Sequence, residues 1–598
     1  MCGIIGCYCK DKAQEILLNG LKRLEYRGYD SAGLSIFDGK EINTLKAQGR
    51  VAALEERLNA GHEFGGGIGI AHTRWATHGA PNEKNAHPHT VGRVSVVHNG
   101  IIENFKEKKA ELTAEGRSFC SETDTEVLAA LLDKFLNEGK SLTHAAAELL
   151  ETAQGAMAAA FLIDAQPPVI LALKRKSPLF IGRAHDGLLL ASDLRAMPDT
   201  VEEYTALEDE EFAILQAFDC CFFNRHGRLK KKFIRKTQEF TEYSKAEFEH
   251  FMLKEIYEQP RTIADTLSYT QNTALKNADA IKKAEHLHII ACGTAYHAGL
   301  LIADCFEKKA RLRCSVHYAG EFRYSSPILK SGELCLAISQ SGETADTLAA
   351  LSLALRQGLY CIGLINSPHS TAERECAEVI YTKAGPEVAV AATKSFTAQV
   401  AAGIILAARA AEIRACLTHS ELRDIYFAAS ALPTAIAKAL SVEEEIKKIA
   451  AEISRHKSVF FIGRGRDLPL AYEGALKLKE ISYIHAEALA GSELKHGTIS
   501  LIEKNTPVIA LSIGFSHTEK LASGIAEIRA RGGRVTVFTD SAGPFDDCEK
   551  TVLLPQGPEP FSPLVGAVAV QLLAYHTANY LGRDIDKPRN LAKSVTVE

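Results

Sequence analysis

The second residue of this chain is a cysteine, in the opening run Met1-Cys2-Gly3. Because the residue after the initiator methionine is small, we expect Met1 to be removed, so that Cys2 carries both a thiol and a free α-amine. A thiol titrates near pH ~8.5 and an α-amine near ~8, so the amine can act as the base for its own thiol at neutral pH. This pair is the minimum for an N-terminal nucleophile. A small buried residue at the start of a strand is the alternative.

Further polar and charged side chains gather in short motifs of the N-terminal region. The motifs are Arg27-Gly28-Tyr29-Asp30-Ser31, His72-Thr73-Arg74-Trp75-Ala76-Thr77-His78, His98-Asn99-Gly100-Ile101 and Ser121-Glu122-Thr123-Asp124. Together with Cys2 they resemble the glutaminase domain of the N-terminal-nucleophile amidotransferases. The resemblance implies an α+β fold of the αββα type, in which Cys2 attacks the side-chain amide of glutamine and releases ammonia.

The resemblance also implies how glutamine and the transition state are held. The Asn99 side chain and the Gly100 N–H would stabilise the tetrahedral oxyanion, which needs preorganised donors. Arg74 would bind the α-carboxylate of glutamine as a two-pronged donor. Asp124 would bind the α-ammonium group of the same substrate.

Three neighbouring residues complete the implied glutamine site. Thr77 and His78 would line the pocket, and Trp75, the single tryptophan, would gate the passage of ammonia. Taken one at a time, these side chains have simpler explanations: a tryptophan is most often a buried ring, and Arg74 could be solvated. Asp124 could merely cap the helix that follows it.

Metal ligands are a further possibility, because five histidines lie close together in this region, at His72, His78, His87, His89 and His98. Their spacing matches no common zinc pattern. The 14 cysteines include no paired C-x2-C motif. We therefore expect neither a metal ion nor a cofactor.

A second reactive region begins at the run Ser339-Gln340-Ser341-Gly342-Glu343-Thr344, which follows an apolar stretch and precedes an expected helix at 345–355. Hydroxyls and N–H groups at a helix start can bind phosphate without a lysine. Serine-rich turns are common, but with Cys292-Gly293-Thr294 this run resembles the sugar isomerase domain, a family of phosphosugar binders. The resemblance implies that the sugar phosphate is held by Thr294, Ser339, Gln340, Ser341, Thr344 and Val390.

The strand and loop pattern occurs again near 458–514, where the corresponding run is Ser512-Ile513-Gly514-Phe515-Ser516-His517-Thr518. It has fewer hydroxyls, so we expect this copy to have lost its phosphate site. Its helix instead carries Glu473, Lys477 and Glu480 at positions i, i+4 and i+7, which share one face. A salt-bridged stripe facing solvent is the alternative.

His496 and the closing residues 590–598 extend the resemblance to the glutamine–fructose-6-phosphate aminotransferase family, bacterial in type, over almost the whole chain. The implied reaction converts L-glutamine and D-fructose 6-phosphate into L-glutamate and D-glucosamine 6-phosphate, the first step of amino-sugar synthesis. By resemblance, His496 opens the sugar ring and Lys593 forms a Schiff base with the C2 ketone. Glu480 then moves a proton between C1 and C2 with the help of Lys477.

Three positions depart from the family pattern. Ala295 and Ala392 each stand where serine is common, and Ser492 stands where a small residue, usually glycine, is common. We expect weaker sugar binding there, with the chemistry retained. An acceptor such as phosphoribosyl pyrophosphate is less favoured, because the second half lacks an acidic diphosphate-binding loop. A phosphosugar sensor would need neither Cys2 nor Lys593.

The elements that position these residues follow from their patterning. In residues 1–238, short alternating strands such as 68–73 and 93–98 occur with two helices, one of them at 124–137, which predicts an α+β domain. After a polar linker at 239–246, strand, glycine turn and helix repeat, which predicts parallel α/β units. Equal spacing of two strand–loop pairs predicts a duplicated doubly wound domain, at 247–430 and 431–583, followed by a tail at 584–598. The resemblance implies that both copies are sugar isomerase domains.

Composition limits the remaining possibilities. The chain has 598 residues, too many for one core, with 46% hydrophobic and 24% charged residues. A net charge of −5 without a basic run argues against nucleic acid. Without a long apolar run or a signal peptide, we expect a cytoplasmic protein that does not contact membranes. The family resemblance favours a homodimer.

Overall fold

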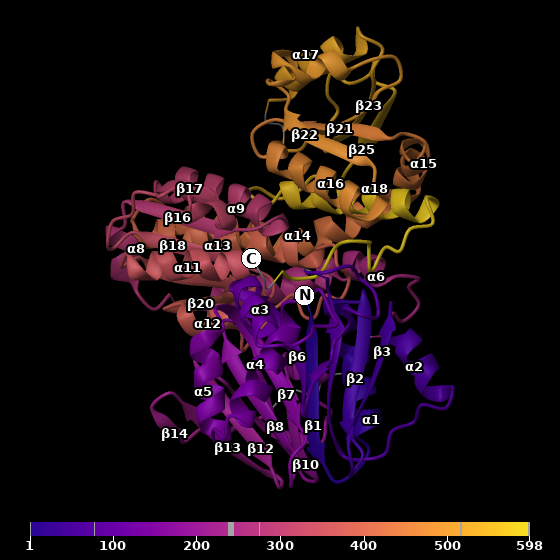
Figure 1. Cartoon of the computed structure of the whole chain (residues 1–598). Coiled ribbons are helices and arrows are strands. Elements are labelled where there is room, and N and C mark those ends of the chain that lie inside the picture. Colours follow the sequence, from indigo (N-terminus) through magenta and orange to yellow (C-terminus); the bar gives the residue numbers. More distant parts are fainter. Residues whose placement is uncertain (1, 77, 237–243, 274, 515–516, 596–598) are drawn as a thin grey trace. The chain divides into compact units, whose positions relative to one another are not determined.

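The computed structural model describes residues 2–76, 78–236, 244–273, 275–514 and 517–595 (Figure 1). By its contacts the chain divides into two compact units, Met1–Tyr243 together with Ser594–Glu598, and Ser244–Lys593. The predicted domain boundary at residue 238 falls within 237–243, outside the described residues.

Two antiparallel sheets form the centre of the first unit. The eight-stranded sheet has the order β15-β11-β9-β10-β1-β4-β2-β3, and the seven-stranded sheet has the order β14-β13-β12-β8-β7-β6-β5. The strands of the first are β1 (Gly3–Cys9), β2 (Ser31–Phe37), β3 (Ile42–Gln48), β4 (Ile68–Arg74), β9 (Phe180–Ala184), β10 (Gly187–Ala191), β11 (Val201–Ala206) and β15 (Ile234–Arg235). Those of the second are β5 (His89–Val91), β6 (Val94–Ile102), β7 (Gly155–Ile163), β8 (Val169–Arg175), β12 (Glu211–Gln216), β13 (Asp219–Asn224) and β14 (Gly227–Leu229).

The apolar side chains show how these sheets are layered. Alternate residues of β1 face opposite ways: Ile4 packs in one cluster with Val97 of the second sheet, and Ile5 packs with Leu17 and Leu21 of a helix. The helices of the unit are α1 (Ala13–Leu24), α2 (Val51–Asn59), α3 (Phe105–Ala114), α4 (Thr125–Asn137) and α5 (Leu142–Thr152). Since α4 and α5 cover the second sheet, the predicted αββα layering is confirmed.

The number of helices in this unit was underestimated, since five are described where two were expected. The sequence contains a signal for α1, because Leu17, Leu21 and Leu24 recur at helical spacing and are fully buried.

The second unit contains two parallel five-stranded sheets of identical topology, β17-β16-β18-β19-β20 and β22-β21-β23-β24-β25. In each, the second strand along the chain lies outside the first, which is the doubly wound order 2-1-3-4-5. The strands are β16 (His286–Ala291), β17 (Arg313–Tyr318), β18 (Leu334–Ser339), β19 (Tyr360–Ile365), β20 (Glu378–Tyr381), β21 (Ser458–Gly463), β22 (His485–Ala490), β23 (Pro507–Ser512), β24 (Arg534–Thr539) and β25 (Lys550–Leu553). The predicted duplication of a parallel α/β unit is therefore confirmed.

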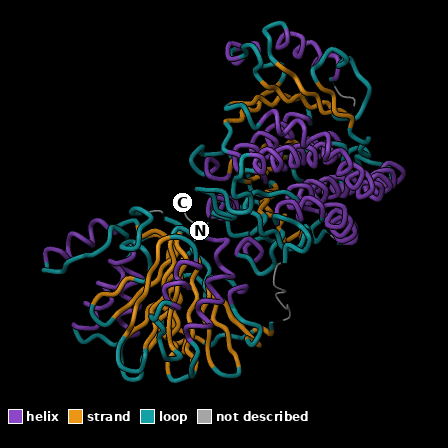
Figure 2. Tube along the Cα trace, turned by 90° about the vertical axis from the view of Figure 1, so that its right-hand side faces the viewer, coloured by secondary structure: helices purple, strands orange, loops and turns teal. Residues whose placement is uncertain are grey.

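Helices pack against both of these sheets (Figure 2). They are α6 (Phe251–Tyr257), α7 (Gln259–Asn272), α8 (Ala278–Lys283), α9 (Thr294–Cys305), α10 (Ala319–Phe322), α11 (Ala345–Arg356), α12 (Thr371–Glu375), α13 (Lys394–Ile413), α14 (His419–Ala439), α15 (Glu443–Ile453), α16 (Asp467–Ser482), α17 (Thr518–Arg529) and α18 (Pro563–Tyr580). One apolar cluster includes residues of α9, α13, α16 and α18 and of strands from both sheets. Helices α9 and α16 begin just after the first strand of each sheet, which places their first turns at the carboxyl ends of the strands.

Two helical stretches of this unit are long and apolar enough to span a membrane by length and composition, Lys394–Ile413 and His419–Ile453. In helix α13, 83% of the residues in the most apolar window are buried, as in a core helix of a doubly wound fold. The second stretch is 33% buried over its most apolar window and is interrupted by a 3-10 turn at Leu440–Val442. Core helices pass the same test, so it gives only weak evidence for a membrane span.

Candidate active site

Cys2 lies directly before β1, beside the end of β4. The Trp75 N–H donates to Cys2 Sγ at 3.2 Å, and the thiol lies 3.5 Å from the Trp75 carbonyl oxygen. Asn99 approaches from β6 of the other sheet, and its Nδ2 donates to the Cys2 carbonyl oxygen at 3.1 Å. The pairing of β1 with β4 and the packing of the two sheets thus bring the predicted nucleophile and the predicted oxyanion donor together.

The buried His72 side chain fixes the orientation of the Asn99 amide. His72 Nε2 lies 3.1 Å from Asn99 Oδ1 and 3.1 Å from the His98 carbonyl oxygen. Both of these atoms are acceptors, so the His72 proton sits on Nε2. Burial lowers the pKa of His72 to about 3, which keeps the ring neutral at pH 7. Asn99 therefore presents its amide nitrogen toward Cys2, as an oxyanion donor must.

Gly100 occupies a backbone position that no other residue can adopt without rearrangement. Its φ is +137°, and a Cβ there would lie 2.0 Å from the Ala156 carbonyl oxygen and 2.8 Å from His98 Nε2. Both the backbone conformation and the contact across to β7 therefore require glycine. This explains why the oxyanion motif reads Asn-Gly.

Arg74 and Asp124 are buried, with exposed fractions of 3% and 4%. Arg74 donates hydrogen bonds to the carbonyl oxygens of residues 78–80, which shape the loop after β4. Asp124 Oδ2 accepts the Ile102 N–H at 2.8 Å. Although Asp124 stands at the N-cap of α4, its side chain makes no capping hydrogen bond. The alternatives of a solvated arginine and a helix-capping aspartate are therefore wrong.

The electrostatics of the thiol favour the protonated form. Burial raises the pKa of Cys2, while the Trp75 N–H and the guanidinium groups of Arg74 and Arg27 act in the opposite direction. A thiol in this position needs a base to react at neutral pH.

The remaining residues of the predicted glutamine site lie around these groups. The half-buried Trp75 ring meets the Tyr29 ring edge-on, with centroids 5.8 Å apart. The His78 ring packs edge-on against Phe105 at 5.3 Å. Thr77 lies outside the described residues.

In the second unit, the predicted phosphate loop follows the carboxyl end of β18. Ser339 Oγ accepts the Gly342 N–H at 3.0 Å and lies 3.3 Å from Thr344 Oγ1. Ser341 Oγ accepts the Glu343 N–H at 3.1 Å. The loop that contains Gln340 therefore gathers hydroxyls and N–H groups at the start of α11, where the helix dipole favours an anion.

The corresponding loop of the second copy has a different electrostatic character. Ser512 Oγ lies 3.3 Å from Thr518 Oγ1, the same spacing as between Ser339 and Thr344. However, the N–H of residue 513 donates to Asp467 at 3.1 Å and that of residue 514 donates to Asp540 at 2.9 Å. Carboxylates thus hold the N–H groups that a phosphate would use, which favours loss of phosphate binding in this copy.

The charged stripe on α16 is buried, so the alternative of a solvent-facing salt bridge is wrong. Lys477 and Glu473 have exposed side-chain fractions of 1% and 0%. Lys477 Nζ donates to Thr294 Oγ1 at 3.0 Å and to Glu480 Oε2 at 2.5 Å. Burial opposes the charge on Lys477, but the two glutamates outweigh it and raise the pKa of this lysine. Glu473 also accepts from His297 Nδ1 at 2.8 Å.

Lys593 forms a buried ion pair with Glu387, whose side chain is 0% exposed. Glu387 accepts the N–H groups of Thr393 and Ser395 at 2.9 and 3.0 Å. Its charge also contributes to raising the pKa of Lys477. The sequence reasoning missed Glu387. A single carboxylate in the otherwise apolar run 384–393 was the available signal.

Two further predicted residues differ in how they are held. Val390 is 9% exposed, and its N–H donates to the Asp586 carbonyl oxygen at 3.0 Å, which fastens the C-terminal segment to this loop. His496 is exposed in a 3-10 turn at Leu494–His496. Within the described part of the chain, no hydrogen bond or ion pair joins its side chain to Lys477 or Lys593.

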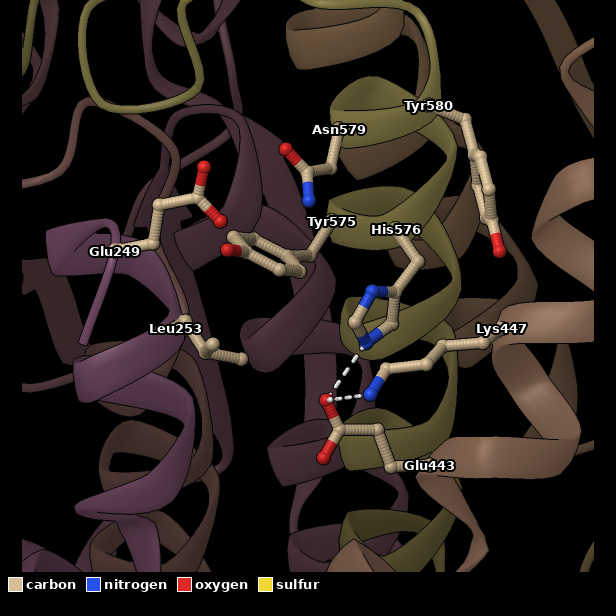
Figure 3. Close-up of a pocket in the computed structure, with 8 residues that line it drawn as sticks. All are labelled: Glu249, Leu253, Glu443, Lys447, Tyr575, His576, Asn579 and Tyr580. Atoms are coloured by element: carbon tan, nitrogen blue, oxygen red, sulfur yellow. Dashed lines mark hydrogen bonds and ion pairs between the residues drawn. The ribbon is translucent and has the colours of Figure 1, made fainter. Parts of the chain in front are cut away.

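A separate cavity of about 320 Å³ opens beside α18, and Figure 3 shows the residues around it. It is lined by Glu249, Leu253, Glu443, Lys447, Tyr575, His576, Asn579 and Tyr580. Glu443 Oε1 accepts from His576 Nε2 at 2.8 Å and lies 3.6 Å from Lys447 Nζ. None of the predicted site residues lines this cavity.

Two family models match the chain. A glutamine amidotransferase domain matches residues 72–199, and the SIS domain matches residues 280–409 and again 452–579. Both predicted domain types are therefore confirmed, with the second present twice.

Curated relatives match over the full length. The chain is 44% identical over 614 residues to glutamine–fructose-6-phosphate aminotransferase (isomerizing) of Bradyrhizobium diazoefficiens, 43% over 608 residues to that of Brucella suis, and 42% over 611 residues to that of Clostridium tetani. Each alignment covers 100% of both chains. The C-terminal domain of glucosamine-fructose-6-phosphate aminotransferase from Francisella tularensis superposes with a TM-score of 0.55 at 37% identity, covering 58% of this chain and 100% of that one.

Proposed function

The chain belongs to the glutamine–fructose-6-phosphate aminotransferase family, and we propose that it transfers the amide nitrogen of L-glutamine to D-fructose 6-phosphate. The products are D-glucosamine 6-phosphate and L-glutamate. One observation carries this proposal: a single chain holds the Cys2–Asn99 arrangement of an amidotransferase and a buried lysine–carboxylate cluster beside a hydroxyl-lined phosphate loop.

At the glutamine site, Cys2 Sγ attacks the amide carbon while its proton passes to the α-amine freed by removal of Met1. Because burial raises the pKa of the thiol, proton transfer has to accompany this attack. Asn99 Nδ2 and the Gly100 N–H hold the oxyanion. The proton then leaves with ammonia, and water hydrolyses the thioester to release glutamate and restore the thiol.

Substrate recognition at this site follows from the buried charges. Arg74 binds the α-carboxylate of glutamine and Asp124 binds its α-ammonium group. Each is already aimed by backbone hydrogen bonds, so little side-chain entropy is lost when glutamine binds. His78 completes the described part of the pocket.

At the sugar site, the phosphate binds to residues 339–344 beside Thr294, and His496 opens the sugar ring. Lys593 Nζ adds to the C2 ketone and water leaves, giving an iminium ion. The Lys593–Glu387 ion pair has to be broken first, because a protonated amine has no lone pair for attack. Ammonia then displaces the lysine from C2.

The final isomerisation needs a carboxylate that can both accept and return a proton. The C2 imine acidifies the C1–H bond, so Glu480 takes a proton from C1 and returns one to C2. The C1 hydroxyl gives up its proton and the imine nitrogen gains one, so that C1 becomes the aldehyde carbon and C2 carries the amine. Lys477 lies 2.5 Å from Glu480 and 3.0 Å from Thr294. It thereby holds the carboxylate beside the phosphate end of the site.

The finer features of the family are part of the same proposal. We infer a homodimer with shared sites, a cytoplasmic location and a passage for ammonia gated by Trp75. The released ammonia must be shielded from water, because at pH 7 ammonia in water is mostly protonated and is then no longer a nucleophile.

The proposal is tested by following both half-reactions in one preparation. The unaltered enzyme should release glutamate and form glucosamine 6-phosphate in equal amounts, with glutamate release stimulated by fructose 6-phosphate. Cys2→Ala should abolish glutamate release and keep the isomerisation of fructose 6-phosphate. Release of glutamate without any aminosugar would contradict the proposal, and so would loss of both activities in a folded Cys2→Ala variant.

A further inference from the structure

Three histidines and a glutamate gather on one face of the first parallel sheet. His286 and His288 lie on β16, His317 lies on β17, and Glu333 directly precedes β18. In the strand register His288 pairs with Ser315, two residues before His317. Because alternate residues of a strand face the same way, all three histidines project from one face of the sheet.

The distances within this cluster approach those of a metal site. His288 Nε2 lies 3.2 Å from Glu333 Oε2, and ligand atoms of His286, His288 and Glu333 all lie within 4.8 Å of one another. Zinc bonds of about 2.0–2.2 Å in tetrahedral geometry place neighbouring ligand atoms about 3.3–3.6 Å apart. The His288–Glu333 pair already has nearly this spacing. The His286 ring, stacked on His288 with centroids 4.3 Å apart, needs a rotation and a shift of about 1 Å.

The surroundings of these side chains supply the second shell that metal ligands require. His288 Nδ1 lies 3.3 Å from His317 Nε2, so when His288 ligates through Nε2 its other nitrogen donates to His317. Glu333 Oε2 accepts the Lys330 N–H at 3.0 Å, which holds the carboxylate in place. Ligands oriented in this way lose little freedom when an ion binds.

Access also suits a metal ion. His288 and Glu333 are 3% and 7% exposed, whereas His286 and His317 are half-buried. An ion can therefore enter from the side of His286 and His317 and reach the buried pair.

We propose that His286, His288 and Glu333 bind a divalent transition-metal ion of the zinc type, with His317 as the hydrogen-bond acceptor that orients His288. Two imidazoles and one carboxylate form a donor set typical of zinc, whereas magnesium and calcium prefer oxygen ligands throughout. Water completes the coordination. This cluster was missed from the sequence, where no metal site was expected, because Glu333 lies far along the chain from the two histidines.

The position of the site indicates its role. His288, the ligand nearer the carboxyl end of β16, lies three residues before the last residue of the strand, Ala291, and therefore about 10 Å from the loop that leads to Thr294. The ion would therefore not contact the proposed sugar site. It would instead join β16 to the start of β18 and stabilise the first SIS domain.

The test is a zinc titration of the full-length protein after removal of metals, in competition with a chromophoric chelator. A Cys2→Ala background removes the proposed catalytic thiol as a competing ligand. We expect one site that His288→Gln or Glu333→Gln weakens at least tenfold, and that His317→Gln weakens by roughly 10- to 100-fold, as loss of a second-shell partner does. His419→Gln, a change at an exposed histidine of α14, should leave the affinity unchanged.

Unchanged zinc affinity and stoichiometry in folded His288→Gln and Glu333→Gln variants would overturn the proposal. Circular dichroism and retained isomerisation of fructose 6-phosphate check that these variants fold. A crystal of the zinc-treated Cys2→Ala protein gives a measurement that is independent of the His288 and Glu333 variants. An anomalous zinc peak between His286, His288 and Glu333 supports the proposal, and zinc bound elsewhere with no peak there contradicts it.

Discussion

The buried Lys593–Glu387 pair gives the most quantitative prediction. Replacing Glu387 by glutamine keeps the shape of the side chain but leaves Lys593 buried, with a side-chain exposed fraction of 4%, and without its counter-charge. Burial opposes the charge on Glu387, but Lys593 and the hydrogen bonds from Ser395 outweigh it and lower the pKa of this carboxyl from 4.5 to about 2. Glu387→Gln should therefore destabilise the unit Ser244–Lys593.

The size of the effect follows in two ways. Lowering the pKa of Glu387 from 4.5 to about 2 corresponds to about 3 kcal/mol of folding free energy at pH 7. Removing one partner of a buried pair typically costs about 3–5 kcal/mol. Because the folded pKa lies below the unfolded one, this stabilisation is present above about pH 4.5 and is lost as the pH falls toward 2.

The assay is a double-mutant cycle with Glu387→Gln, Lys593→Met and the double variant, unfolded in guanidinium chloride and followed by circular dichroism. The first unit is the same in all four proteins, so differences between their curves report on residues 244–593. We expect a coupling energy of at least about 2 kcal/mol at pH 7 that declines below pH 4.5. A coupling energy below about 0.5 kcal/mol, as for an exposed pair, would refute the reasoning.

Three other changes test separate parts of the structure. Gly100→Ala should reduce glutaminase activity about 100-fold or more, because its Cβ would lie 2.0 Å from a carbonyl oxygen. The control is Gly139→Ala, which is also at positive φ but has open space around it and should leave the activity unchanged. Equal losses of activity in the two variants would contradict the steric argument. Burial and Glu387 raise the pKa of Glu255 to about 8, so the contribution of this carboxyl group to stability should fall as the pH rises from about 4.5 to 8. Glu255→Gln should remove this contribution to the pH dependence of stability. If the melting temperatures of the variant and of the unaltered protein run parallel between pH 5.5 and 8.5, the role assigned to Glu255 is wrong. Trp75→Ala should keep glutamate release but lower the yield of aminosugar per glutamate, and a one-to-one ratio would exclude the gate.

Much of the fold follows from local pattern. Strand β16 and helix α9 are separated by a short glycine turn, and the same order recurs at β21 and α16, so the duplication could be predicted from the sequence. Whether a polar face points to solvent or to another element is not a local property. The spacing of Glu473, Lys477 and Glu480 predicts a shared face, but the partner of the buried Lys477 on another helix, Thr294, lies far away in sequence.

The site residues divide in the same way. Cys2 and Asn99 belong to recognisable motifs, and their contact needs only two sheets packed face to face. Glu387 stands in a loop without a motif, and its importance comes from Lys593, about 200 residues further along the chain. The pair His288 and Glu333 is likewise brought together by neighbouring strands of the sheet. Such long-range pairs can be found only once the strand order is known.

The central claim is that nitrogen passes from glutamine to the sugar within one protein. The most direct measurement incubates the unaltered enzyme with fructose 6-phosphate, glutamine labelled with ¹⁵N in its amide, and an excess of unlabelled ammonium, and determines the label in glucosamine 6-phosphate by mass spectrometry. The account predicts that the product carries ¹⁵N almost completely, and that Cys2→Ala forms no labelled product. Product labelled only to the level of the mixed ammonia pool, or no aminosugar at all, would contradict it.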